Sequence, residues 1–514
     1  MYCSEDHPRV AGSGGGVSPT PADTRQINGH IQGEIAQMSH RNKVPTSDLA
    51  STLDTASPAK GVQPSAGASS VSPTFAPPVT GTNICVIGGG FVGLVSAAGF
   101  AEFGHSVVCV EKDLGRLKEL QAGRVPFYEN ELGDLIRVNL ENGRLSFSND
   151  LAASLKGQKA IFIAVGTPAA ESGRTDLGAL EDLIVSMAGE LTKGQIVVLK
   201  STVPVGTAER VRAMLSSNGA SNKQIPVISN PEFLREGSAV YDFFHPQRIV
   251  IGGDSPESVD SIAHIHRLGM KDRAPIVVTN NATAEMIKYA SNAFLATKIG
   301  FANELSGVCD EMKVNVLEVA RGMGLDPRIG AEFLSPGPGW GGSCLPKDVS
   351  EYIGLGSAQG LEMHIARAVL EANQSHHARV VDKVKKLVGK LSGAKIGVLG
   401  LSFKADTSDM RNSPAIPIVW ALRESGAHVL VFDPAVGEEA AEMFPGVEFA
   451  SGAADVADGA DCILILTEWQ EFQMLDWAAI GSGMRQRNLV DARNLLTPET
   501  LRRYDFKYES MGQV

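Results

Sequence analysis

The stretch that decides the fold is Asn83-Ile84-Cys85-Val86-Ile87-Gly88-Gly89-Gly90-Phe91-Val92-Gly93. Its first half is a short apolar run typical of a buried strand, and its last glycine leads into a helical pattern over residues 94–103. A second apolar run, residues 107–110, ends at Glu111. This order of strand, glycine turn, helix, strand and acid is the fingerprint of a dinucleotide-binding fold.

Each residue of the fingerprint has a physical task. Gly88 allows the tight turn, Gly90 lets a pyrophosphate approach the backbone, and Gly93 lets helix and strand pack closely. The helix N-terminus then faces the pyrophosphate. Glu111 is placed to accept hydrogen bonds from the adenine ribose, which favours NAD, while nearby cations keep NADP as the alternative. An ordinary tight turn is the weaker interpretation, because the strand context and the acid are both present.

Three further buried strands are predicted over residues 160–165, 195–199 and 226–229. Each runs into polar residues, which could simply cap the helices that follow. In open α/β sheets, however, ligands bind beyond the carboxyl ends of the strands. Three polar strand ends in succession therefore predict a binding site at that edge of the sheet.

A long helical pattern starts at Asn281 and runs without Gly or Pro to Ile299. Lys288 and Asn292 are one helical turn apart, so they lie on one face and suggest a partly buried polar site. A solvated lysine is the ordinary alternative. The helix is expected to bridge two domains and to supply a dimer surface.

A second α/β unit begins with the predicted strand 395–400, and later strands are predicted over residues 429–434, 462–467 and 488–493. The full glycine fingerprint is missing after Gly400. A phosphate-bearing ligand other than a dinucleotide is therefore expected here, with Lys404 placed to meet its charge.

Between the two units lies Gly339-Trp340-Gly341-Gly342-Ser343-Cys344-Leu345-Pro346-Lys347-Asp348. Gly341 and Gly342 are expected to let a ligand approach the backbone. A nearby cation such as Lys347 would lower the pKa of the Cys344 thiol and favour the nucleophilic thiolate. A buried structural cysteine is the alternative, and on Cys344 alone it is preferred. The position of the loop between two nucleotide-type folds reverses that preference.

Composition sets further limits. The chain has 514 residues, which is too long for one ordinary core, and its net charge of -12 argues against nucleic-acid binding through a basic surface. No apolar run is long enough to cross a bilayer. The cysteines are scattered without a CxxC pair, which argues against a disulfide framework or a metal site and fits a reducing, cytoplasmic compartment.

These features predict an α/β chain with two Rossmann-like, doubly wound domains joined by a long central helix and a helical dimerisation region. The expected divisions are a disordered low-complexity tail at 1–81, an NAD-binding domain at 82–280, the central helix and dimerisation region with the cysteine loop at 281–391, and a second nucleotide-type domain at 392–514.

The ordered chain resembles the UDP-glucose/GDP-mannose dehydrogenase family. The resemblance is carried by motifs in the same order along the chain: residues 88–93, Val165-Gly166-Thr167-Pro168, residues 200–206, 230–237, 285–292 and 341–348, Gly400 to Asp406 with Arg411-Asn412-Ser413-Pro414, Thr467-Glu468-Trp469, and Asp491-Ala492-Arg493-Asn494. Chance does not account for so many motifs in the same order.

The resemblance implies a four-electron oxidation of the sugar 6-hydroxymethyl of a nucleotide sugar to a carboxylate, with two NAD. Cys344 would attack the intermediate aldehyde to give a thiohemiacetal and then a thioester, which water hydrolyses. The implied catalytic residues are Cys344, Lys288, Asp348, Asn292, Glu232 and Thr202. The implied NAD-binding residues are Gly88, Gly90, Val92, Gly93, Glu111, Arg116, Thr167, Thr202, Glu236, Lys347 and Arg411. The implied substrate-binding residues are Glu232, Phe233, Leu234, Arg235, Glu236, Lys288, Asn292, Phe333, Leu334, Ser335, Pro336, Gly337, Gly341 and Lys404, with Arg328 reaching from a partner subunit in a homodimer or larger homo-oligomer.

The resemblance is not uniform. Glu111 stands where the family usually has Asp, and Arg116 where it often has Lys. Leu345 is also seen in GDP-mannose enzymes, whereas Asp326-Pro327-Arg328-Ile329-Gly330 looks more like the UDP-glucose branch, which we favour. The alternatives are the same chemistry on GDP-mannose or an N-acetylated UDP-sugar, a two-electron hydroxyacid dehydrogenase, and a nonenzymatic NAD-dependent binding protein.

Overall fold

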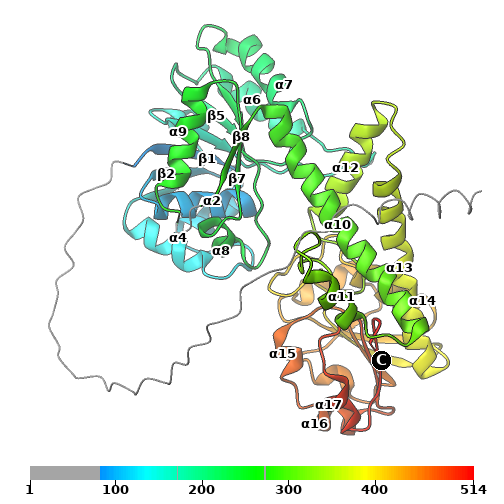
Figure 1. Ribbon diagram of the computed structural model, residues 1–514. Helices are drawn as coiled ribbons and strands as arrows, with labels where there is room; N and C mark the ends of the chain where they lie inside the picture. Colours follow the sequence, from blue (N-terminus) through cyan, green and yellow to red (C-terminus); the bar gives the residue numbers. More distant parts are fainter. Residues whose placement is uncertain (1–80, 171, 271–273, 514) are drawn as a thin grey trace, which may run out of the picture. The chain divides into compact units, whose positions relative to one another are not determined.

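The computed structural model describes residues 81–170, 172–270 and 274–513. The predicted low-complexity tail, residues 1–81, lies outside these ranges except for Gly81. The described part contains two β-sheets flanked by helices, and a long helix lies between them in the sequence (Figure 1). The predicted fold class, with two Rossmann-like domains and a long central helix, is confirmed.

The first sheet has the strand order β3-β2-β1-β4-β5-β6-β7-β8. Neighbouring strands are parallel except for β6 and β7, which are antiparallel. The strands are β1 (Asn83–Ile87), β2 (Ser106–Val110), β3 (Leu145–Ser148), β4 (Ala160–Ile163), β5 (Ile196–Leu199), β6 (Val227–Ser229), β7 (Ile249–Gly252) and β8 (Ile276–Thr279).

Helices cover both faces of this sheet because alternate strand residues are buried on opposite sides. In β1, Ile84 and Val86 join a core with α2, α4 and α9, whereas Cys85 and Ile87 join a core with α6 and α7. The helices of this domain are α2 (Phe91–Glu102), α3 (Leu114–Gln121), α4 (Leu132–Glu141), α5 (Leu151–Leu155), α6 (Gly178–Ala188), α7 (Thr207–Leu215), the π-helical turn η1 (Ser216–Ala220), α8 (Ala239–Phe244) and α9 (Pro256–Arg267).

The central region is helical, as predicted, but its first helix is longer than expected. Helix α10 (Asn281–Met312) continues past Ile299 through Gly300 and Gly307. A Cβ on Gly307 would lie 2.7 Å from the Arg379 guanidinium, so this glycine admits a side chain of α13 rather than ending the helix. The other helices are α11 (Val316–Gly324), α12 (Leu345–Ser357) and α13 (His364–Val388).

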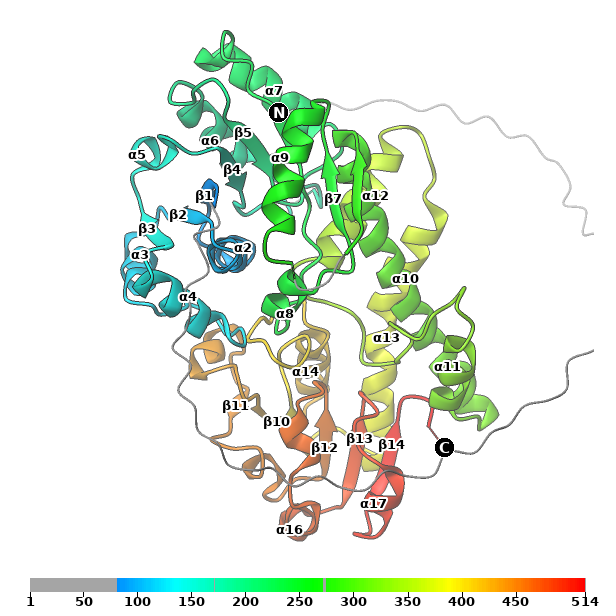
Figure 2. The ribbon, with the colours of Figure 1, turned by 60° about the vertical axis from the view of Figure 1, so that its left-hand side comes forward.

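The second sheet has the order β11-β10-β9-β12-β13-β14, and all its neighbouring strands are parallel (Figure 2). Helices α13 and α14 pack on one face, and α15, α16 and α17 pack on the other. The elements are β9 (Lys395–Leu399), α14 (Ala415–Glu424), β10 (His428–Phe432), η2 (Glu438–Met443), β11 (Glu448–Phe449), η3 (Asp455–Ala457), β12 (Cys462–Ile465), α15 (Gln470–Gln473), α16 (Trp477–Gly483), β13 (Asn488–Asp491), α17 (Pro498–Arg502) and β14 (Lys507–Ser510).

The predicted strands exist, but several end earlier than the apolar pattern suggested. The strand predicted over residues 160–165 ends at Ile163, and the one predicted over 429–434 ends at Phe432. The predicted bounds run further because Ala164 and Asp433, directly after these strands, are still buried. The polar loops that follow β4, β5 and β6 all leave the same edge of the first sheet.

Candidate active site

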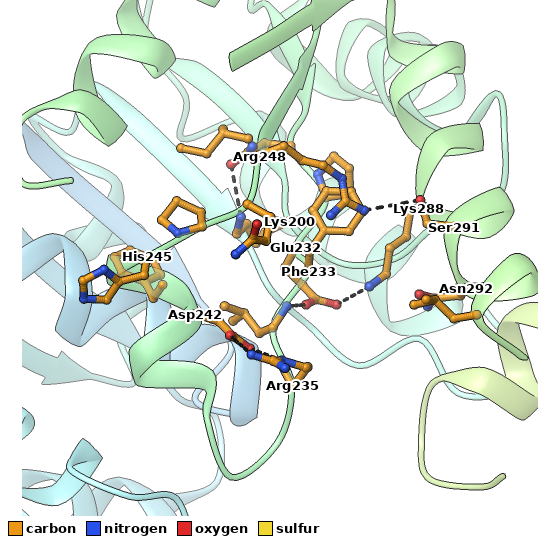
Figure 3. Close-up of a pocket in the computed structure, with 18 of the residues that line it drawn as sticks. Lys200, Glu232, Phe233, Arg235, Asp242, His245, Arg248, Lys288, Ser291 and Asn292 are labelled. Carbon is orange, nitrogen blue, oxygen red and sulfur yellow. Dashed lines mark hydrogen bonds and ion pairs between the residues drawn. The ribbon is translucent and has the colours of Figure 1, made fainter. Parts of the chain in front are cut away.

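A cavity of about 680 Å³ lies beyond the carboxyl ends of β5 and β6 and against α10 (Figure 3). Strands that run parallel bring their ends to one edge, which is why distant segments of sequence meet here. The sequence-predicted residues that line the cavity are Glu232, Phe233, Leu234, Arg235, Lys288, Asn292 and Phe333.

A buried ion pair crosses the cavity wall. Lys288 Nζ on α10 donates to Glu232 Oε1 at 2.9 Å, and the two side chains are 5% and 6% exposed. Burial opposes charge on both groups, but the pKa of Glu232 is lowered because the Lys288 ammonium, the Leu234 N–H and Lys200 together outweigh that penalty. Burial likewise opposes the charge on Lys288, yet Glu232, Cys344 and Asp348 raise its pKa. Both groups are therefore charged at neutral pH.

A second buried contact joins α10 to α12. Asn292 Nδ2 donates to Asp348 Oδ2 at 2.6 Å, and Lys347 Nζ lies 2.5 Å from Asp348 Oδ1. The Asp348 side chain is buried. Each of its two oxygens contacts a side chain that the sequence analysis singled out. The prediction that Lys288 and Asn292 share a buried polar face is correct, since both lie on the buried side of α10.

Cys344 caps the N-terminus of α12, where Pro346 occupies one of the first helical positions. It is the exposed cysteine of the five that the structure describes; Cys85, Cys109, Cys309 and Cys462 are buried. Protein atoms nevertheless surround the sulfur closely, and burial together with Glu232 raises the thiol pKa, against the opposing effects of Lys288 and a hydrogen bond with Ser343.

The expectation that Lys347 activates the thiol is therefore wrong for the free protein. The Lys347 ammonium is turned to Asp348, whereas the Lys288 ammonium lowers the thiol pKa. Sequence proximity placed a cation near the cysteine but could not show where its flexible side chain points.

The two glycines before the cysteine also differ from expectation. A Cβ on Gly341 would lie 2.1 Å from the carbonyl oxygen of Asn412, and one on Gly342 would lie 2.9 Å from the Phe403 ring. Gly342 also has φ +83°, which a side chain rarely adopts. These glycines admit neighbouring protein segments at the positions a Cβ would take, rather than a sugar.

The glycine turn after β1 fits a dinucleotide. A Cβ on Gly88 would lie 2.5 Å from Ala164 O, and one on Gly93 would lie 1.8 Å from Gly88 O, so turn, strand and helix are packed closely. At Gly90, the N-cap of α2, no atom lies within 4 Å of that position, which leaves the backbone open to a ligand. Val92 lies in the first turn of the same helix.

The predicted acid, Glu111, directly follows β2. Glu111 is buried, accepts a hydrogen bond from the Asp113 backbone at 2.8 Å, and lies 3.4 Å from Arg116 Nη1. Its carboxylate lies close over Gly89, at the edge of the glycine turn. A carboxylate at this position can accept hydrogen bonds from ribose hydroxyls, and Arg116 is paired with it.

The other predicted cofactor residues gather at the loops beyond β4 to β6. Thr167 Oγ1 donates to Thr202 O at 2.9 Å. Glu236 accepts from Ser343 Oγ at 2.9 Å and from Thr407 Oγ1 at 3.2 Å. Arg411 lies 3.8 Å from Glu236 and is paired with Asp409 at 2.7 Å.

Several predicted substrate residues lie outside the cavity lining. Arg328 is 87% exposed and is paired with Asp326. Leu334, Pro336 and Gly337 are buried and Ser335 is exposed; of this loop's predicted residues, Phe333 lines the cavity. Lys404 is half-buried, and its charge opposes the rise in the pKa of Glu129 that burial causes.

The structure adds residues to which the sequence assigned no role. Lys200, at the end of β5, and His266 line the cavity floor, and both contact Asn230 Oδ1, at 3.3 and 2.9 Å. The Arg248 guanidinium stacks 3.7 Å from the Phe233 ring centroid. Lys200 ends a predicted strand, a position that could have marked it; nothing in the sequence points to the stacking.

Two features are absent from the described residues: a membrane-spanning helix and a metal-binding cluster. No helix among them combines the length and apolar character needed to span a bilayer. They also contain no cluster of three or more His, Cys, Asp or Glu side chains arranged to hold a metal ion.

The fold and site together define a dehydrogenase with one dinucleotide-binding domain, a second nucleotide-type domain and a cysteine at the active site. Three family descriptions match successive parts of the chain: the NAD binding domain of the UDP-glucose/GDP-mannose dehydrogenase family at residues 82–268, its central domain at 282–375, and its UDP binding domain at 397–498. The chain belongs to the UDP-glucose/GDP-mannose dehydrogenase family, and its cofactor is NAD.

Individual relatives agree with this assignment. The chain is 41% identical over 435 residues to UDP-glucose 6-dehydrogenase of Rhizobium meliloti (strain 1021), covering 84% of this chain and 99% of the relative. It is 39% identical over 431 residues to UDP-glucose 6-dehydrogenase TuaD of Bacillus subtilis (strain 168), covering 84% and 93%. The solved UDP-glucose dehydrogenase of Pyrobaculum islandicum matches with a TM-score of 0.79 at 36% identity, over 86% of this chain and 100% of that one.

Proposed function

We propose that the chain acts as a UDP-glucose 6-dehydrogenase, which oxidises the C6 hydroxymethyl of UDP-glucose to a carboxylate with two NAD. The observation that carries the proposal is the arrangement of Cys344, Lys288 and Asp348, in which the exposed cysteine residue lies beside a buried, charged lysine and a buried aspartate. A two-electron dehydrogenase would have no use for the thiol. UDP-glucose is favoured because the relatives named for it are the more similar ones; a UDP-D-ManNAc dehydrogenase from Pyrococcus horikoshii is 29% identical.

NAD supplies a hydride acceptor, and the residues that would hold it are the open glycine turn at Gly90, Glu111, the loop residues Thr167, Thr202, Glu236 and Arg411, and Lys347 in the first turn of α12. The protein's own contribution to the first oxidation is electrostatic. The Lys288 ammonium, already charged against Glu232, stabilises negative charge that develops on the C6 oxygen. Asn292 orients the same oxygen, and the Asp348 carboxylate receives its proton.

The thiol of Cys344 makes the second oxidation possible. An aldehyde has no carbinol hydrogen to lose as hydride until a nucleophile adds to its carbon. Attack by sulfur gives a thiohemiacetal, whose oxidation leaves a thioester on Cys344. Glu232, with Thr202, would then direct the water that releases the acid.

A panel of nucleotide sugars tests this function. Initial rates of NADH release would be measured with UDP-glucose, GDP-mannose and an N-acetylated UDP-hexosamine, each at equal concentration. The proposal predicts that UDP-glucose gives the highest kcat/KM. A higher value for another sugar would move the substrate assignment within the family, and release with none would remove the enzymatic proposal.

We also propose that the chain forms a homodimer through α10. Phe294, Phe301, Val308 and Met312 are 65%, 51%, 52% and 68% exposed, and they follow one another at about two, two and one helical turns, so they form one apolar stripe. A second copy of the same helix would cover this stripe symmetrically. Such a dimer would also bring a partner's Arg328, which is exposed here, within reach of a substrate.

Light scattering after gel filtration tests the dimer. The wild-type chain should elute with about twice the mass of one chain, and Phe301→Glu should shift it toward the monomer. Tyr241→Glu, which also replaces an exposed aromatic side chain, is the matched control. A monomeric wild type would overturn the proposal. The proposed compartment is the cytoplasm, in line with the unpaired thiols of the described cysteines.

A further inference from the structure

The proposed function needs Cys344 as a nucleophile, so the thiol proton must be taken up when the sulfur attacks. Burial and Glu232 raise its pKa, and the Lys288 ammonium offsets this only in part. Glu232 is engaged with Lys288, and Asp348, which Asn292 and Lys347 contact, is assigned to the proton of the C6 hydroxyl. The thiol proton therefore needs another acceptor.

The hydrogen bonds of the neighbouring serine provide one. Ser343 Oγ lies 3.5 Å from Cys344 Sγ, and it donates to Glu236 Oε1 at 2.9 Å. In the arrangement in which the serine proton is directed at the carboxylate, the hydroxyl oxygen accepts the hydrogen bond of the thiol. The three groups thus form an ordered chain from thiol to hydroxyl to carboxylate.

We propose that Ser343 and Glu236 form a proton relay that deprotonates Cys344 as it attacks the aldehyde. This proposal rests on the proposed function and assigns Ser343, which contacts the reacting sulfur, as a further catalytic residue. Glu236 acts through Ser343.

The step balances without an oxidant. The S–H bond breaks while sulfur forms a bond to the aldehyde carbon, and the carbonyl electron pair moves to oxygen, which faces Lys288. The thiol proton passes to Ser343 Oγ, and the serine proton passes to Glu236, which becomes a neutral acid. The Glu236 side chain is 13% exposed, so it can return the proton to solvent before the next turnover.

The surroundings of Glu236 suit a proton acceptor. Its second oxygen is held by Thr407, and the charged groups that face it are Asp409 and Arg411. Burial and the Asp409 carboxylate raise the pKa of Glu236, while Ser343, Arg411 and Thr407 oppose this. Around the thiol the charged groups are Glu232, Lys288 and Asp348, with Arg411 also in range.

The test measures thiol reactivity without NAD or sugar, so that it does not depend on the substrate assignment. The rate of Cys344 alkylation by iodoacetamide would be followed against pH by peptide mass spectrometry. The variants are Ser343→Ala, Ser343→Thr and Glu236→Gln. Glu236→Gln is decisive, because glutamine can still accept the Ser343 hydrogen bond but cannot take up the proton.

The relay predicts that Ser343→Ala and Glu236→Gln both slow alkylation at neutral pH by about tenfold or more, within the range of general-base effects. Ser343→Thr should restore most of the rate. With the UDP-sugar aldehyde as substrate, Glu236→Gln should lower kcat by a similar factor at unchanged melting temperature. A wild-type alkylation profile in Glu236→Gln would overturn the relay and leave Ser343 a purely structural contact. If the wild-type protein released no NADH with any nucleotide sugar, that result would count against the proposed function and not against the relay.

Discussion

Lys288 and Glu232 form a buried ion pair, with Nζ and Oε1 2.9 Å apart, at the wall of the cavity that the sequence predicted as a site. One partner comes from α10 and the other from the loop after β6. The pair therefore joins the central helix to the NAD-binding domain, and both charges face the thiol.

Lys288→Met should lower both activity and stability. Loss of the cation that meets charge on the C6 oxygen should reduce kcat by about 10²-fold or more. The variant also leaves Glu232 buried without its partner, which should cost about 3–5 kcal/mol in the free energy of unfolding. NADH release and urea denaturation measure the two effects.

The double variant Lys288→Met, Glu232→Leu separates these effects. Removing both charges should recover most of the lost stability while activity stays low. Lys390→Met, at an exposed lysine, is the matched control and should change neither. Full activity in Lys288→Met would contradict the assigned role of Lys288.

Glu232→Gln should accumulate the covalent intermediate. Without the carboxylate that directs the hydrolytic water, the thioester on Cys344 should persist after addition of UDP-glucose and NAD. Intact-protein mass spectrometry would detect a mass increase that is absent from the double variant with Cys344→Ala. A Glu232→Gln protein that turns over at the wild-type rate without an adduct would exclude this role.

Gly341→Ala should destabilise the protein by about 1–3 kcal/mol, because its Cβ would meet the Asn412 carbonyl oxygen 2.1 Å away. Gly483→Ala is the matched control, since nothing lies within 4 Å of its Cβ position. Thermal denaturation of the two variants should differ clearly. Equal melting temperatures would mean that the loop carrying Asn412 moves away at no cost, and would return Gly341 to the substrate-access role expected from the sequence.

Stability should fall as pH drops from about 6.5 to about 4, in part because of His376. Its Nε2 lies 2.8 Å from Gly337 O and so anchors the loop that follows Phe333. Burial lowers the pKa of His376 to about 4, with smaller effects from the Gly337 contact, Arg379 and His377. Between these two pH values the unfolded chain binds more protons than the folded one, so about 3 kcal/mol is lost as pH falls.

Urea denaturation at several pH values measures this contribution as a difference between variants. His376→Gln keeps an N–H donor for Gly337 O and should flatten the pH dependence over that window. His364→Gln, at an exposed histidine, should leave the wild-type dependence intact. An identical pH dependence in wild type and His376→Gln would show that His376 does not contribute to the loss of stability at low pH.

Much of the fold was predictable because it depends on local patterns. The run from Asn83 to Gly93 predicted β1, the turn and α2, and the buried face of Lys288 and Asn292 followed from their helical spacing. The extent of α10 was not predictable, because Gly300 and Gly307 read as breaks unless Val369 and Arg379 of α13 are known to pack there.

The electrostatics of the site were harder to predict for the same reason. Lys347 is three residues from Cys344, yet its ammonium is turned to Asp348. Glu236 was predicted as a ligand-binding residue, but its contact with Ser343 joins segments more than a hundred positions apart and depends on tertiary packing. Sequence spacing gives the faces of helices, not the directions of long side chains.

The most direct test of the account is the amount of NADH formed per UDP-glucose in a limiting-sugar assay, with Cys344→Ala in parallel. A four-electron oxidation through the thiol predicts about two NADH per sugar for the wild type and no complete oxidation for the variant. One NADH per sugar, or a Cys344→Ala protein that still yields two, would contradict the account.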